Sequence, residues 1–197
     1  MRHMRNYFFP LLILLFSACG EPDLPSPYHA IDISWQHAHA DFQLTDSNGK
    51  PRSLINFRGK VVVLFFGYTH CPEICPTTLA DLAQMMRLLG KDAEHVQVLF
   101  ITLDPERDNP ELLAKFVPSF DPSFLGLYGD NQSTALAAKS FGVNFVKRSD
   151  EHGNYTLDHS DGIYLIGTRG KPLLLSPSAK PAAQLAQDIR LLLSISR

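Results

Sequence analysis

The sequence predicts one α/β domain in which a central mixed sheet is flanked by helices. Apolar runs typical of buried strands alternate along the chain with segments of helical periodicity. No internal repeat interrupts this alternation. The part of the chain that follows its leader, roughly 180 residues, is long enough for one domain with a full core. We therefore expect a single folding unit.

The first half of the domain is predicted to contain a hairpin, a buried strand and a helix. Residues 42–46 alternate between apolar and polar side chains, and the Asn-Gly pair at 48–49 favours a hairpin turn. Residues 61–66 are continuously apolar, which is typical of a central strand buried on both faces. Residues 76–89 carry apolar side chains at helical spacing, and Gly90 ends this pattern.

The second half continues the alternation. Residues 96–103 have the pattern of another buried strand. The segment 108–111 supplies a cap residue, a proline and an early acid, which start a helix that runs through Phe116. Further strands are expected at 124–128, 163–166 and 173–175, helices at 133–141 and 182–193, and a β-hairpin over 144–157 that turns at 151–154.

The N-terminal residues are typical of a secretory signal. Arg2 and Arg5 precede a short apolar segment, and small residues follow it before Cys19. The apolar segment is too short to cross a bilayer as a mature helix. Its end resembles the lipobox of bacterial lipoproteins, although Phe16 stands where leucine is usual. We expect residues 1–18 to be a lipoprotein-type signal peptide and Cys19 to be acylated. An uncleaved anchor and an ordinary signal with an unmodified cysteine are the alternatives.

Residues 19–40 are predicted to be a flexible, lipid-anchored tether, and residues 41–197 the folded domain. Three prolines and two acids lie between residues 20 and 28. His37 and His39 could bind a metal weakly, but two positions apart in a flexible segment they are better interpreted as solvated. The expected location is the periplasmic side of a bacterial membrane, with the inner membrane favoured.

The charge of the chain excludes one class of partner. Its formal net charge is −2, and removal of the leader, which contains arginines and no acid, makes the mature chain more acidic. The sequence therefore gives no electrostatic basis for nucleic-acid binding.

Cys71 and Cys75 form the most informative motif. They lie four positions apart, between a predicted strand and a predicted helix, where they could form a disulfide or bind a soft metal. A bridge that closes so short a loop constrains little of the unfolded chain, so a structural disulfide is disfavoured. Amide groups at a helix start are expected to lower a thiol pKa and favour thiolate. Two buried, inert thiols are the unreactive alternative.

A metal site needs a third ligand, and His159 is the candidate. It precedes the apolar strand predicted at 163–166, where a loop would reach the sheet. Two thiolates and one imidazole suit copper, with zinc as the main competitor. His70 is expected to point away from the adjacent Cys71.

Three separated segments resemble the Sco/SenC family. They are THCPEICPTTL at 69–79, LDPERD at 103–108 and DHS at 158–160, within a resemblance that covers about residues 40 to 195. The resemblance implies a thioredoxin-like fold and a role in cytochrome c oxidase assembly, with the 144–157 hairpin as the family's insertion before the histidine. It also implies one copper ion per chain, as Cu(I) or Cu(II), bound by Cys71, Cys75 and His159. Asp104 would lie near the metal without being a stable ligand; its alternative role is to start the turn after the strand.

Three functions remain open from the sequence. The first is a copper chaperone that passes Cu(I) to the dinuclear copper (CuA) centre of cytochrome c oxidase subunit II. The second is a thiol–disulfide oxidoreductase that keeps oxidase cysteines reduced; the Cys-x-x-x-Cys spacing and the absence of proline between Pro122 and Pro172 count against a general role. The third is a redox or copper sensor. Other periplasmic copper carriers and thiol reductants are further expected partners.

Overall fold

The computed structural model describes residues 26–37 and 39–195. The predicted signal peptide over 1–18 and the predicted acylation site at Cys19 lie outside these residues. Within the described part of the chain, no helix has the length and apolar character needed to cross a membrane.

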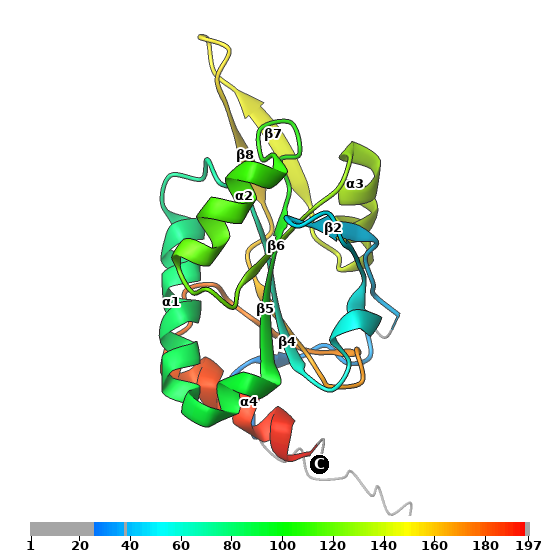
Figure 1. Ribbon diagram of the computed structural model, residues 1–197, viewed down its shortest axis with the longest axis vertical. Helices are drawn as coiled ribbons and strands as arrows, with labels where there is room; N and C mark the ends of the chain where they lie inside the picture. The colour runs from blue at the N-terminus through cyan, green and yellow to red at the C-terminus, as the bar shows by residue number, and fades with distance from the viewer. Residues whose placement is uncertain (1–25, 38, 196–197) are drawn as a thin grey trace, which may run out of the picture.

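A mixed sheet forms the centre of the domain (Figure 1). Within the described residues its eight strands follow the order β1 (Ile31–Asp32), β10 (Pro172–Ser176), β9 (Ile163–Ile166), β4 (Val61–Gly67), β5 (Val96–Thr102), β6 (Leu125–Tyr128), β2 (Leu44–Asp46) and β3 (Pro51–Arg52). The strands β4, β5 and β6 are parallel, and the remaining neighbours are antiparallel. Every side chain of β4 is buried, as its continuous apolar pattern predicted.

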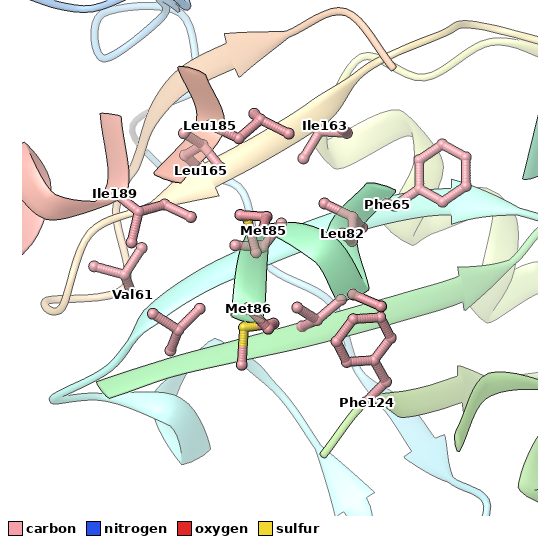
Figure 2. Close-up of a cluster of buried hydrophobic side chains, with 14 of the residues drawn as sticks. Val61, Phe65, Leu82, Met85, Met86, Phe124, Ile163, Leu165, Leu185 and Ile189 are labelled. Carbon is pink, nitrogen blue, oxygen red and sulfur yellow. The ribbon is translucent and has the colours of Figure 1, made fainter. Parts of the chain in front are cut away.

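Helices cover both faces of the sheet. They are α1 (Ile74–Leu89), α2 (Pro110–Phe116), α3 (Asn131–Ser140) and α4 (Ala182–Ser194). One face packs against α1, α2 and α4, and Figure 2 shows Val61, Met85 and Ile189 among the side chains that meet there. The other face packs against α3 and the N-terminal segment. These layers confirm the predicted thioredoxin-like α/β class, a mixed sheet flanked by helices.

The predicted elements are present with small changes at their ends. The helix expected at 133–141 begins at Asn131, because the Asp130 carboxylate caps it by accepting a hydrogen bond from the Ser133 amide at 2.7 Å. The helix expected from residue 76 begins at Ile74. This shift places Cys75 inside the first helical turn and leaves Cys71 in the loop before it.

The predicted tether is wrong at its C-terminal end, because the domain begins before residue 41. The β1 strand pairs with β10, and Ile33 is only 2% exposed. The buried Asp188 carboxylate on α4 accepts hydrogen bonds from the amides of His29 at 2.8 Å and Ala30 at 2.9 Å. These contacts fix residues 29–33 to the domain. The ring of His37 lies edge-on to that of Tyr164, so this histidine is not simply solvated.

A two-stranded hairpin stands apart from the central sheet. It consists of β7 (Phe145–Ser149) and β8 (Tyr155–His159), which pair only with each other among the described strands. It projects beyond the end of the sheet (Figure 1). The Asp150 carboxylate stabilises its turn by accepting hydrogen bonds from the amides of His152 and Asn154. The predicted hairpin is confirmed, and its second strand extends to His159.

Candidate functional site

The two cysteines differ in burial. Cys75 is fully buried, whereas Cys71 is partly exposed at the surface. Neither forms a disulfide in this structure. The Cys75 amide donates a hydrogen bond to Cys71 Sγ at 3.5 Å, so the backbone of one cysteine touches the sulfur of the other. A strand-to-helix turn thus brings both thiols to the C-terminal end of β4.

Close packing beneath Cys75 explains the glycine at the end of β4. A Cβ added to Gly67 would lie 2.8 Å from Cys75 Sγ and 2.9 Å from the Phe100 ring. Only glycine allows this approach. Burial raises the pKa of the Cys75 thiol, with the neighbouring Cys71 adding to the effect. The predicted lowering by the helix start is therefore wrong for Cys75, because loss of hydration on burial has the largest effect on this thiol.

The loop that carries Cys71 is anchored by Asp108. This buried carboxylate accepts hydrogen bonds from the Thr69 amide at 2.9 Å and the Thr69 hydroxyl at 2.6 Å. It also accepts one from the Thr102 hydroxyl at 2.6 Å. His70 Nδ1 lies 3.0 Å from Thr69 Oγ1 and 3.6 Å from Asp108 Oδ1. The ring of His70 is thereby engaged by Thr69 and Asp108, consistent with the prediction that it points away from Cys71.

His159 approaches the cysteine loop from the hairpin. It is the last residue of β8 and pairs with Phe145, rather than lying in a free loop as predicted. Its Nδ1 is 2.9 Å from the Ser160 carbonyl oxygen. Because a carbonyl can only accept, Nδ1 carries the proton and Nε2 keeps a lone pair for a ligand. The His159 ring also lies edge-on to the Tyr68 ring, with centroids 6.2 Å apart.

One pocket of about 430 Å³ joins the two parts of the site. Cys71 and Tyr68 line it on the loop side, and residues 156–159 line it on the hairpin side. Over residues 26–37 and 39–195, however, no three His, Cys, Asp or Glu side chains form a ready-made metal cluster. The donors have the soft chemistry that suits copper. To share one ion, His159 and the cysteines would have to move closer together.

Asp104 binds protein groups rather than lining this pocket. Its Oδ1 accepts a hydrogen bond from the Tyr155 hydroxyl at 2.7 Å, and its Oδ2 accepts one from Arg107 Nε at 2.5 Å. Its carbonyl oxygen accepts from the Asp108 amide, so it also starts the turn after β5. Both carboxylate oxygens are occupied, which fits a supporting position near the site and disfavours a ligand role.

Four residues around the site were not predicted from the sequence. They are Tyr68, Arg107, Asp108 and Tyr155. The signal for Asp108 was the third acid of the 103–108 segment, which follows a buried strand. Tyr155 gave no signal, because its partner Asp104 is 51 residues away along the chain.

Comparison with known proteins identifies the family. The family model described as SCO1/SenC matches residues 33–194 of the 197. This chain belongs to the SCO1/SenC family. The match begins at residue 33, in agreement with the N-terminal segment being part of the domain.

Relatives within the SCO1/SenC family include mitochondrial and bacterial proteins. The chain is 40% identical to the mitochondrial SCO2 homologue of Mus musculus over 153 residues, which cover 76% of this chain and 60% of that protein. The chain thus spans about three fifths of that curated relative. The structure of Bradyrhizobium japonicum ScoI with copper bound matches with a TM-score of 0.72 and 38% identity, over 78% of this chain and 98% of that one. A SCO1/SenC family lipoprotein from Bacillus anthracis matches with a TM-score of 0.68 and 26% identity, over 82% and 96%.

Proposed function

We propose that this chain is a copper chaperone that binds one copper ion and assists assembly of the CuA centre in cytochrome c oxidase subunit II. The observation that carries the proposal is the pocket shared by Cys71 and His159, with Cys75 directly behind Cys71. Two sulfurs and one imidazole nitrogen are a soft donor set for copper. Copper bound to a SCO1/SenC relative of the same fold supports this assignment.

The unequal exposure of the ligands suits transfer of a cargo ion. Cys71 is reachable from solvent and would meet copper first, while the buried Cys75 would give up its proton on binding. His159 would complete the site through Nε2 from the hairpin side. Three protein ligands leave copper open to attack by an acceptor thiolate, so the ion can pass by ligand exchange without being free in solution.

Copper stoichiometry of purified variants tests this assignment. We expect Cys71→Ala, Cys75→Ala and His159→Ala each to lose stoichiometric copper after dialysis, measured by elemental analysis. His152→Ala is the matched control, because it removes an exposed histidine from the turn of the same hairpin. The assignment fails if the three site variants retain as much copper as His152→Ala and the wild type.

A thiol–disulfide reductase for oxidase cysteines is the second candidate. It is favoured by the contact between the Cys75 amide and Cys71 Sγ, which brings the two cysteines together. Exchange between thiols needs no imidazole ligand. Two assays of His159→Ala therefore separate the candidates. A pure reductase should still reduce a CuA-site peptide disulfide at the full rate, whereas a chaperone should lose copper delivery.

We further propose that Cys19 is acylated and holds the domain on the periplasmic side of a bacterial membrane, the inner membrane being favoured. The lipobox-like segment before Cys19 and the lipoprotein relative from Bacillus anthracis support this. Stable anchoring needs more than one acyl chain. Metabolic labelling with a radioactive fatty acid should mark the wild type and spare Cys19→Ser; equal labelling of both would contradict the proposal.

A further inference from the structure

We propose that Asp104, Arg107 and Tyr155, here called the clasp, hold the hairpin β7–β8 against the loop after β5 and so position His159 opposite Cys71. The inference rests on the proposed copper-binding function and goes beyond it, because it names positioning residues for the histidine ligand. None of the three lies beside His159 in the sequence. Each acts through the hairpin and not by touching the ion.

The hairpin needs such a support because its backbone pairs with no other strand described here. A two-stranded hairpin is at best marginally stable in water. Four of the five residues of β7 are exposed, so β7 buries little apolar surface against the body. Side-chain contacts therefore decide the angle of the hairpin to the domain, and with it the place of His159.

The clasp supplies the polar part of these contacts, in addition to the packing of the buried Leu157 of β8 against the core. Tyr155, the first residue of β8, donates its hydroxyl to Asp104 Oδ1 at 2.7 Å. Arg107 Nε donates to Asp104 Oδ2, and Arg107 Nη1 donates to the Tyr155 carbonyl oxygen at 2.9 Å. The guanidinium carbon lies 3.6 Å from the centroid of the Tyr155 ring. Arg107 thus contacts the backbone and the ring of Tyr155, and also Asp104, which accepts the hydrogen bond from the Tyr155 hydroxyl.

The Tyr155 hydroxyl can donate its hydrogen bond across the neutral pH range. Burial, with the hydrogen bond to Asp104 and its charge, raises the pKa of Tyr155 to about 12. The hydroxyl therefore stays protonated through the neutral range. Hydrogen bonds to a charged acceptor are about twice as strong as those between neutral groups.

The loop after β5 also fixes the cysteine half of the site. The Thr102 hydroxyl accepts from the Asp104 amide at 3.0 Å and donates to Asp108 Oδ2 at 2.6 Å. Asp108 in turn holds the loop before Cys71 through Thr69. One short segment, residues 102–108, therefore sets the two halves of the site relative to each other: Asp108 for the cysteines and the clasp for the histidine.

If the clasp positions His159, Tyr155→Phe, which keeps the ring and removes the hydroxyl, should lower the affinity for copper. Positioning partners of metal ligands are worth roughly 10- to 100-fold in affinity, so we expect the dissociation constant for copper to rise by that factor. If Tyr155 acts through His159, the substitution should cause no further loss in a His159→Ala background. Arg107→Lys, which keeps the charge but loses the planar fork, should behave in the same way.

The experiment combines copper titration with amide hydrogen exchange of the metal-free protein. Copper(II) sulfate is titrated against a competing chelator, with thiolate-to-copper absorption as the signal. In the metal-free Tyr155→Phe protein, amides of residues 145–159 should exchange about tenfold faster than in the wild type. Tyr164→Phe is the matched control: it removes a buried hydroxyl that donates to the Phe141 carbonyl oxygen, away from the hairpin.

The outcomes separate the clasp from the proposed function. Faster hairpin exchange with a His159-dependent loss of affinity supports the clasp. Wild-type hydrogen exchange and copper affinity in both Tyr155→Phe and Arg107→Lys overturn it. It is also overturned if Tyr155→Phe lowers copper affinity as much in the His159→Ala background as in the wild type. If the wild type itself binds no copper, the proposed function fails. Exchange in the metal-free proteins then still decides whether these residues hold the hairpin.

Discussion

The cysteines and His159 lie on parts of the molecule that are held in different ways. Cys75, in the first turn of α1, is fully buried against the end of β4, where even a methyl group at Gly67 would not fit. His159 ends a hairpin that stands outside the central sheet and is held by the polar contacts of the clasp and by the packing of Leu157 against the core. The core therefore fixes the thiols, whereas the clasp sets the imidazole. A site built this way can change the number of its ligands without disturbing its core.

The largest effect is expected from removing the carboxylate that anchors the cysteine loop. Asp108→Ala leaves the donors of Thr69 and Thr102 without their buried acceptor. We expect the free energy of unfolding to fall by about 3 kcal/mol or more, measured by urea denaturation. Asp158→Ala is the control, because that acid is exposed and pairs with an exposed arginine. Equal, small losses for both variants would show that the loop is not held by Asp108.

A side chain added beneath Cys75 should also destabilise the part of the domain that holds the cysteines. Gly67→Ala places a methyl group against Cys75 Sγ and the Phe100 ring. Overpacking of this kind costs about 1–3 kcal/mol of unfolding free energy, again measured in urea. An unchanged midpoint would mean that the packing under the thiol is loose, contrary to the comparison drawn above.

The buried thiol should make copper affinity depend on pH. Burial raises the pKa of Cys75, so the metal-free protein carries this proton at neutral pH and releases it when the thiolate binds copper. Raising the pH therefore favours binding, by about tenfold in affinity per pH unit for each proton released. Chelator competition at several pH values between about 6 and about 8 measures the slope. A flat profile would show that Cys75 is not deprotonated on binding.

The smallest effect is expected at the outer edge of the hairpin. Lys147 Nζ pairs with Glu106 Oε2 at 2.7 Å, and both side chains are about half exposed. Exposed ion pairs contribute between about 0 and 1 kcal/mol, so Lys147→Ala should change the free energy of unfolding by less than about 1 kcal/mol. Thermal denaturation at low and high salt measures the difference. A loss as large as that of Asp108→Ala would place the support of the hairpin at this pair instead of at the clasp.

The sequence predicted those parts of the fold that local pattern determines. The continuous apolar runs of β4 and β5 have the signature of buried parallel strands, and the helical spacing after Cys75 identified α1. The β1 strand was missed because it has only two residues and is held partly by Asp188, an acid near the opposite end of the chain. Its short and exposed pattern carries no periodicity.

The site was predictable in its donors but not in its geometry. Cys71, Cys75 and His159 were expected to converge, and two of them line one pocket with the third directly behind. The burial that raises the Cys75 pKa depends on Gly67 and Phe100, which lie on the two central strands. The clasp joins a loop and a hairpin that are 51 residues apart, so spacing alone could not reveal it.

X-ray absorption spectroscopy of the copper-loaded protein tests the central claim most directly. We predict that the copper edge and fine structure report two sulfur ligands and one imidazole nitrogen. In His159→Ala, loaded with copper and measured without dialysis because its affinity is lower, the imidazole scattering should disappear while both sulfurs remain. A spectrum without sulfur ligands, or one whose imidazole signal persists in His159→Ala, would contradict the assignment of copper to Cys71, Cys75 and His159.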